Sequence, residues 1–102
     1  MPGYGRSGPN KDWVAYGPTL DGHVGHTWLT GYEGEGPWKC GIAWPDPIAG
    51  LHAAAGVLVA LLDRQCCGIS GQTVEVPQAE TAINMIGQHT VSYTHLTLPT
   101  KA

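Results

Sequence analysis

The sequence has little positive charge and no phenylalanine. Only 13% of its 102 residues are charged, and Lys and Arg number 5 against 8 Asp and Glu, for a formal net charge of -3. A protein that neutralises nucleic-acid phosphates or binds an anionic membrane surface needs a cationic face, which so few basic residues do not provide. We therefore expect neither a nucleic-acid partner nor a membrane partner.

Long hydrophobic runs and cysteine pairs are also scarce. The longest apolar run, residues 53–62, has ten residues, whereas a helix that crosses a bilayer needs roughly 20. No basic and then apolar leader follows Met1. The cysteines number 3, and the neighbours Cys66 and Cys67 cannot pair without backbone strain. We expect a reduced, cytoplasmic protein with no signal peptide and no transmembrane helix.

Glycine and proline are abundant by contrast, at 15 and 8 residues, and most of them lie in residues 1–47. Residues 48–90 are rich in Ala, Val, Leu and Ile instead. The length allows at most one domain. Residues 31–47 have no hydrophobic period and are typical of a long loop, and such loops inside compact domains are usually functional.

Hydrophobic spacing predicts helices and one strand. Helical spacing runs over 18–29, and more strongly from Pro47 to Gly68, where small residues on the other faces predict burial on most sides. Alternation over 72–76 predicts a half-buried strand. Pro77 then opens a further helix, with an inner face formed by Ala79, Ala82, Ile83 and Ile86.

Asp46 is the most informative polar residue. It lies between two prolines, which predicts that it is the N-cap of the long helix, with Pro47 as the first helical residue. The positive end of the helix favours an ionised carboxylate, and Trp38 and Trp44 are placed to cover it against water. A shielded, ionised carboxylate can act as a nucleophile. A simple structural cap explains the same residue.

Two other patterns fall short of a site. Residues 3–8 match the G-x-G-x-x-G spacing of dinucleotide-binding loops, but no strand precedes them and no helix follows directly. His23 and His26 are three residues apart, with Asp21 nearby, but a third and a fourth metal ligand are missing. We interpret the histidines as the polar edge of a core and predict no metal site.

Three segments in a fixed order carry a resemblance: PGYGRSGP (2–9), AYGPTLDGHVG (15–25) and PDPIAGLHAAAGVLVALLDRQCCGISGQTVEV (45–76). The sequence resembles the middle of family III CoA-transferases, which include formyl-CoA and carnitine CoA-transferases and the alpha-methylacyl-CoA racemases. The resemblance implies an α/β protein. Residues 1–90 would be a partial domain, a fragment of the Rossmann-like large domain with helices plus one or two strands, from a parent that forms an interlocked homodimer.

Residues 91–102, VSYTHLTLPTKA, differ in composition and pattern from the rest of the sequence. Their period alone would suit a strand, but the string resembles the translated sequencing-adapter tails that end many open reading frames from environmental DNA. We therefore expect residues 91–102 to be a non-native tail that is disordered and dispensable.

The resemblance implies a reaction and a role for Asp46. In the transferases, the aspartate at the start of the long helix attacks an acyl-CoA thioester and forms first an anhydride and then an aspartyl-CoA thioester. A free carboxylic acid accepts the CoA. The CoA thioester is a substrate, so no cofactor is expected, and the fragment alone is expected to be inactive.

The position of Tyr16 separates two activities of the family. Racemases have a histidine there that exchanges the alpha proton, whereas transferases commonly have an aromatic residue that contacts the thioester end of CoA. A phenol is a poor proton shuttle at neutral pH, so Tyr16 favours the transferase over the racemase. Formyl-CoA transferases have a glutamate where Gly17 stands, which argues against formate or oxalate. A noncatalytic helical module remains the alternative from another class.

Overall fold

The computed structural model describes residues 1–96, with side chains described as far as Val91. These residues form helices joined by loops, and no strand occurs among them. In chain order the helical elements are α1 (Gly17–His23), α2 (His26–Leu29), α3 (Pro45–Cys67), α4 (Gln78–Ile83), the 3-10 helix η1 (Asn84–Ile86) and α5 (Gly87–Leu96).

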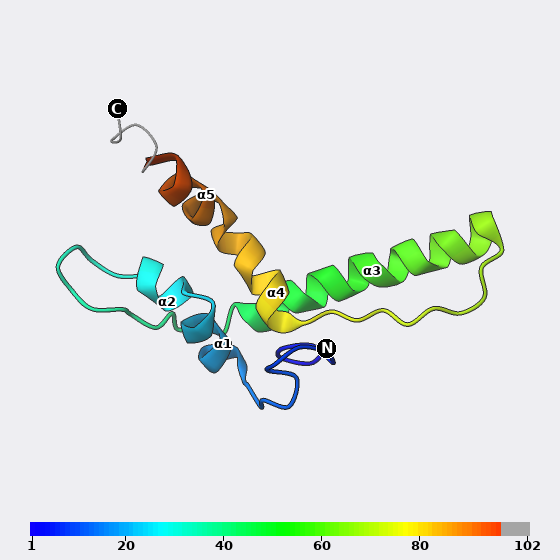
Figure 1. Ribbon diagram of the computed structural model, residues 1–102, viewed down its shortest axis with the longest axis horizontal. Coiled ribbons are helices and arrows are strands. Elements are labelled where there is room, and N and C mark those ends of the chain that lie inside the picture. The colour runs from blue at the N-terminus through cyan, green and yellow to red at the C-terminus, as the bar shows by residue number, and fades with distance from the viewer. Residues whose placement is uncertain (97–102) are drawn as a thin grey trace.

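The elements meet at one end of α3 and spread outward from there (Figure 1). Helices α1 and α4 both pack against α3, and α1 also packs against α4. The radius of gyration is 17.2 Å, whereas a compact chain of this length has about 13 Å. The molecule is therefore elongated, and α1, α3 and α4 pack together at one junction.

The core of this junction is small and is built from short side chains. Leu20 of α1 and Ala49 of α3 are fully buried, and Ala79 and Ala82 of α4 close over them. Short side chains let the helix backbones approach closely. Ile83 was expected on the inner face of α4, but it is 46% exposed, because the packed part of the helix ends there.

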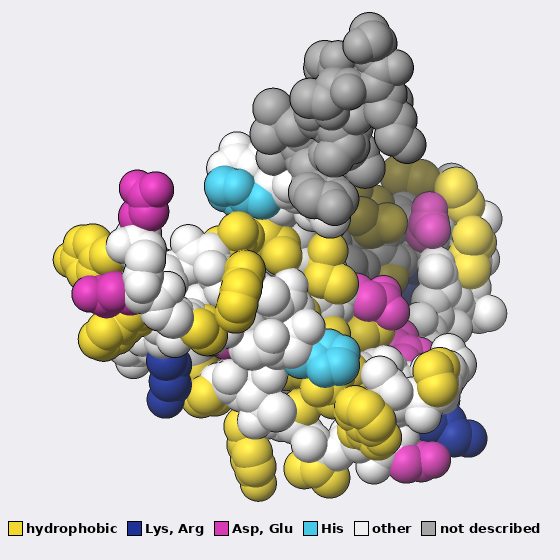
Figure 2. Space-filling model, turned by 60° about the vertical axis from the view of Figure 1, so that its left-hand side comes forward, with side chains coloured by type: hydrophobic (Ala, Val, Ile, Leu, Met, Phe, Trp, Pro, Cys, Tyr) yellow, Lys and Arg dark blue, Asp and Glu magenta, His cyan; other side chains and the backbone are white. Residues whose placement is uncertain are grey.

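Beyond its first turns, α3 projects from the junction, and only Pro45 and Ala49 are buried along its length. The expectation that the helix is buried on most sides is therefore wrong. From residue 51 onward, its large apolar side chains are each at least 50% exposed, namely Leu51, Val57, Leu58, Val59, Leu61 and Leu62. Figure 2 shows hydrophobic side chains spread widely over the surface.

Helix α3 is also longer than the ten-residue apolar run suggested. By length and composition alone, its 23 residues are enough to cross a membrane, although only 11% of its most apolar window is buried here. A helix that lies in the core of a larger soluble protein has the same properties. The length argument against a membrane span is therefore wrong for α3.

The predicted strand over 72–76 does not form. The segment between α3 and α4 runs back alongside α3 (Figure 1), and the side chain of Val74 lies where Gly56 leaves room for it. A strand requires a neighbouring strand to receive its backbone hydrogen bonds, and the described residues provide none.

The predicted helix over 18–29 is broken into two. Gly25 has φ of 89°, in the left-handed region that glycine adopts without steric cost. Helix α1 therefore ends at His23, and α2 begins at His26 in a new direction.

The last helix reaches into the segment expected to be a tail. Helix α5 continues through Val91 to Leu96, so the expectation of disorder is wrong for those residues. Residues 97–102 lie outside the described part of the chain.

Candidate active site

Asp46 lies in the first turn of α3, because the helix begins two residues earlier than the sequence predicts. The helix begins at Pro45, and Trp44 occupies the N-cap position without a side-chain cap hydrogen bond. Pro45 suits the first helical position because its φ is fixed and it has no N–H to satisfy. The prediction that Asp46 is the N-cap is therefore wrong. The carboxylate still lies at the positive end of the helix, where negative charge is favoured.

The carboxylate of Asp46 is held by a residue that sequence reasoning missed. Nε2 of Gln78 donates a hydrogen bond to Oδ1 of Asp46 over 2.7 Å. Gln78 is the first residue of α4, directly after Pro77. Asp46 and Gln78 are 32 residues apart, and no spacing rule for a single helix connects them. Only the packing of α4 on α3 brings them together.

Gln78 is itself fixed at its backbone. Its N–H donates to the carbonyl of Pro2 over 3.0 Å, and the next N–H, of Ala79, donates to Gly3 over 2.9 Å. Its own carbonyl accepts a hydrogen bond from Oγ1 of Thr81 over 2.9 Å. The N-terminal segment therefore satisfies the free N–H groups at the start of α4 and sets the direction of the Gln78 side chain.

Gly17 bounds the other side of the carboxylate. A Cβ atom at position 17 would overlap Oδ2 of Asp46 and would lie 2.5 Å from Cβ of Ala43. Real Cβ atoms do not approach other atoms so closely. Glycine is therefore required where the start of α1 meets the start of α3.

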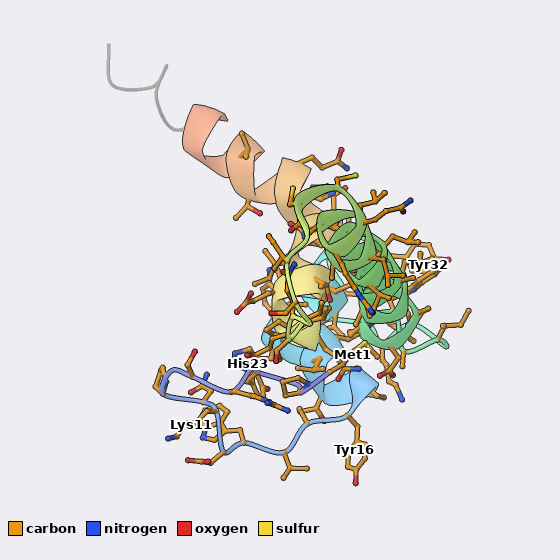
Figure 3. All side chains as sticks on the ribbon, turned by 90° about the vertical axis from the view of Figure 1, so that its right-hand side faces the viewer. Met1, Lys11, Tyr16, His23 and Tyr32 are labelled. Carbon is orange, nitrogen blue, oxygen red and sulfur yellow. The ribbon has the colours of Figure 1, made fainter. Side chains whose placement is uncertain are left out.

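Tyr16 lies next to this contact but turns away from it. Its carbonyl accepts hydrogen bonds from the N–H groups of Thr19 and Leu20, which begin α1. Its side chain is 76% exposed and points away from the helices (Figure 3). The structure thus brings the backbone of Tyr16 to the Asp46 end of α3 and leaves the ring open to solvent.

The expected cover of tryptophans over Asp46 is not present. The backbone N–H of Trp38 donates to the backbone carbonyls of Thr27 and Thr30 at the end of α2. The indole ring of Trp38 lies against Gly31. Asp46 is exposed. The loop over 31–44 folds back on α2 and does not exclude water from the carboxylate, so that prediction is wrong.

The candidate metal ligands form a pair. His26 Nδ1 lies 3.3 Å from Oδ1 of Asp21, whose side chain is 1% exposed. The ring of His23 instead packs edge-on against Tyr4 and Trp13, with centroids 5.0 and 6.1 Å away. Within residues 1–96, no three His, Cys, Asp or Glu side chains gather as a metal site would require.

The arrangement around Asp46 suits nucleophilic chemistry. One oxygen is held by an uncharged amide, the other faces a glycine, and the carboxylate is accessible from solvent. A carboxylate presented in this way at a helix N-terminus can attack a carbonyl carbon and form a covalent acyl intermediate. The site is therefore a candidate for acyl transfer.

Comparison with known proteins identifies the family. The sequence model of the protein family CoA-transferase family III matches residues 1–101. The chain belongs to CoA-transferase family III. The expectation drawn from the three sequence segments is confirmed.

Two curated relatives are CoA-transferases. The chain is 36% identical over 74 residues to succinyl-CoA–D-citramalate CoA-transferase of Chloroflexus aurantiacus, a match covering 72% of this chain and 18% of the relative. It is 35% identical over 83 residues to formyl-CoA:oxalate CoA-transferase of Streptomyces avermitilis, covering 81% and 20%. The chain spans about a fifth of the length of these relatives.

The arrangement of the helices is also found in a solved structure. A CAIB/BAIF family protein from Brucella suis superposes with a TM-score of 0.86 and 26% identity, over 92% of this chain and 25% of that protein. The helices of this chain therefore have the arrangement that the matching quarter of the Brucella suis protein has.

Proposed function

We propose that the full-length protein containing this chain transfers coenzyme A from an acyl-CoA thioester to a free carboxylic acid, with Asp46 as the nucleophile. The observation that carries the proposal is the accessible carboxylate in the first turn of α3, held by Gln78. Family membership supports the class of reaction. The isolated chain, which covers a fraction of its relatives, is proposed to be inactive.

The first half of the reaction loads CoA onto the protein. An oxygen of Asp46 attacks the thioester carbonyl, the C–S bond breaks, and a mixed anhydride forms with free CoA thiolate. The thiolate then attacks the aspartyl carbonyl of the anhydride and expels the donor acid as its carboxylate. Asp46 is left as an aspartyl-CoA thioester.

The second half reverses these steps with a new acid. The acceptor carboxylate attacks the aspartyl thioester and releases CoA thiolate, which gives a second anhydride. The thiolate then attacks the acceptor's acyl carbonyl and frees Asp46. Each step exchanges one activated acyl group for another, so we propose that the protein needs no cofactor. The exposed carboxylate needs protection from water, which we assign to parts of the full-length protein outside this chain.

We propose succinyl-CoA as the donor and a dicarboxylate such as D-citramalate as the acceptor. The relative from Chloroflexus is named for these two compounds. Gly17 supports a choice other than formyl-CoA and oxalate, because the formyl-CoA transferases that the chain resembles have a glutamate at this position. Tyr16 is proposed to contact the thioester end of CoA through its exposed ring, in place of the proton-exchanging histidine of the racemases.

The whole protein is proposed to work as a cytoplasmic homodimer. The exposed apolar side chains of α3 support a larger assembly, since monomeric soluble proteins rarely expose continuous apolar surface of this kind.

The proposal is tested by trapping the intermediate. The full-length protein is incubated with succinyl-CoA and then with hydroxylamine, which converts an aspartyl anhydride or thioester into a hydroxamate. Peptide mass spectrometry should find the hydroxamate on Asp46. Asp63, near the other end of the same helix, is an internal control because it also accepts a hydrogen bond from a glutamine, Gln72, and should stay unmodified.

Exchange of isotope-labelled succinate into succinyl-CoA is measured on the same preparation. A protein that exchanges succinate without modification of Asp46 would remove the covalent mechanism. A protein that shows neither exchange nor hydroxamate would remove succinyl-CoA as the donor.

A further inference from the structure

The two oxygens of the Asp46 carboxylate have different surroundings. Oδ1 accepts the hydrogen bond from Gln78, whereas Oδ2 lies over the Cα atom of Gly17. Among the described residues, no other side chain donates to this carboxylate. A hydrogen bond at Oδ1 restrains the rotation of the carboxylate, whereas Oδ2 accepts no side-chain hydrogen bond among the described residues.

We propose that Gln78 is a positioning residue that selects Oδ2 of Asp46 as the attacking atom and keeps Oδ1 as the carbonyl oxygen of the intermediates. This inference rests on the proposed function. Attack by Oδ2 on the thioester makes Oδ2 the bridging oxygen of the anhydride. Oδ1 then forms the double bond to the aspartyl carbon, still facing the amide of Gln78.

The same amide then serves the next step. When CoA thiolate attacks the aspartyl carbon, the electron pair of the C=O bond moves onto Oδ1, and negative charge develops there. An N–H donor 2.7 Å away stabilises that charge without reorganisation. The electron pair then returns to the C=O bond, and the bond between the aspartyl carbon and Oδ2 breaks. The donor acid leaves as a carboxylate that now contains Oδ2.

The anchoring of Gln78 explains why this donor can act as a fixed group. Its backbone is held on both sides, by Pro2 through its N–H and by Thr81 through its carbonyl. The side chain is half-buried, so it has fewer alternative rotamers than an exposed glutamine. Fixed donors contribute more to catalysis than donors that must turn toward the developing charge.

The test compares Gln78→Met with Gln72→Met in the full-length protein. Methionine keeps the length of the side chain and removes the donor. Gln72 provides a matched control, since it donates to Asp63 over 3.4 Å near the other end of α3. Gln78→Met should lower kcat for succinate exchange on the order of 100-fold, with KM for succinyl-CoA nearly unchanged. Gln72→Met should change neither constant.

A second readout separates positioning from structural support. Without the donor on Oδ1, thiolate attack at the aspartyl carbon slows, whereas water can still add to the acyl carbonyl of the anhydride and release the acid and Asp46. The ratio of succinyl-CoA hydrolysis to transfer should therefore rise in Gln78→Met. In Gln78→Glu, which has the same length but an ionised carboxylate beside Oδ1, transfer should fall at least as far.

The outcomes distinguish this inference from the proposed function. If Asp46→Asn retains exchange activity, the proposed function is wrong. If Asp46→Asn is inactive while Gln78→Met matches Gln72→Met, the role of Gln78 is wrong. A Gln78→Met protein with a lower melting temperature, a raised KM and an unchanged ratio of hydrolysis to transfer would show that Gln78 only supports the fold, and would overturn the inference.

Discussion

The two ends of α3 differ in almost every physical respect. At its start, Ala49 is fully buried, and Asp46 lies between Gln78 and Gly17. At its far end, large apolar residues such as Leu58 and Leu62 are about 60% exposed, at 62% and 58%. Close packing by small side chains thus fixes the candidate site, whereas the larger hydrophobic residues of α3 are exposed in this chain. The residues that position Asp46 are therefore different from the residues that carry most of the apolar surface of α3.

The largest effect is expected at the site end, from Asp46→Asn in the full-length protein. Asparagine can still accept the hydrogen bond from Gln78, but its amide is a poor nucleophile. We expect succinate exchange to fall on the order of 10,000-fold or more, with an unchanged melting temperature. Asp63→Asn is the control and should remain active. Loss of activity together with unfolding would instead indicate a structural role for Asp46.

A smaller but still large effect is expected from Gly17→Ala. The new Cβ would overlap Oδ2 of Asp46, and displacement of a reacting group by about 1 Å can cost on the order of 100-fold in rate. Gly22→Ala is a matched control on the same helix, because no atom lies within 4 Å of its missing Cβ. Equal exchange rates for the two variants would contradict the close contact between α1 and α3.

A third prediction compares the two ends of α3 by stability. In the isolated chain, Ala49→Leu overpacks the junction and should lower the free energy of unfolding by about 1–3 kcal/mol. Leu58→Ala removes a side chain that is exposed in the isolated chain, and should change the free energy of unfolding by less than about 0.5 kcal/mol. In the full-length protein, Leu58→Ala should cost about 2–5 kcal/mol, because the far end of α3 is expected to be covered.

Urea denaturation of both variants in both forms measures this difference. A Leu58→Ala change that is equally harmless in the full-length protein would show that the far end of α3 stays exposed there.

The smallest effect is expected from removing residues 91–102. Helix α5 continues through Leu96, and the family match extends to residue 101. We nevertheless propose that residues 91–102 are not native to the parent protein, because their sequence differs from the rest, and α5 packs mainly against the neighbouring η1. Truncation after Thr90 should change the free energy of unfolding by less than about 0.5 kcal/mol. Clear destabilisation in urea, or the same residues encoded at the parent genomic locus, would contradict the proposal.

Sequence reasoning predicted the elements that depend on local patterns. The apolar spacing after Pro47 predicted α3, and Pro77 predicted the start of α4, because a single helix determines its own period. The strand over 72–76 failed because strand formation depends on a neighbour. The helix over 18–29 failed because Gly25 adopts a left-handed backbone conformation, which the sequence allows but does not require.

The site was predicted in part for the same reason. Asp46 was selected from the chemistry of its own segment, and the family segments placed Tyr16 near it. Gln78 was missed because its contact with Asp46 joins two helices across a long loop. The exposure of Asp46 was mispredicted because Trp38 was expected to cover Asp46, whereas its backbone is hydrogen-bonded to the end of α2. Contacts between distant segments have no signature in either segment alone.

The hydrogen bonds of Gln78 also set an order of events during synthesis. The residue joins the start of the chain, at Pro2, to the start of α3, at Asp46. A growing chain that has just completed α3 already carries the carboxylate, but not the amide that orients it. Contacts of such long sequence separation form late, because closing the intervening loop costs entropy. During synthesis, we therefore expect the carboxylate of Asp46, the proposed nucleophile, to lack this hydrogen bond until α4 has formed and packed on α3.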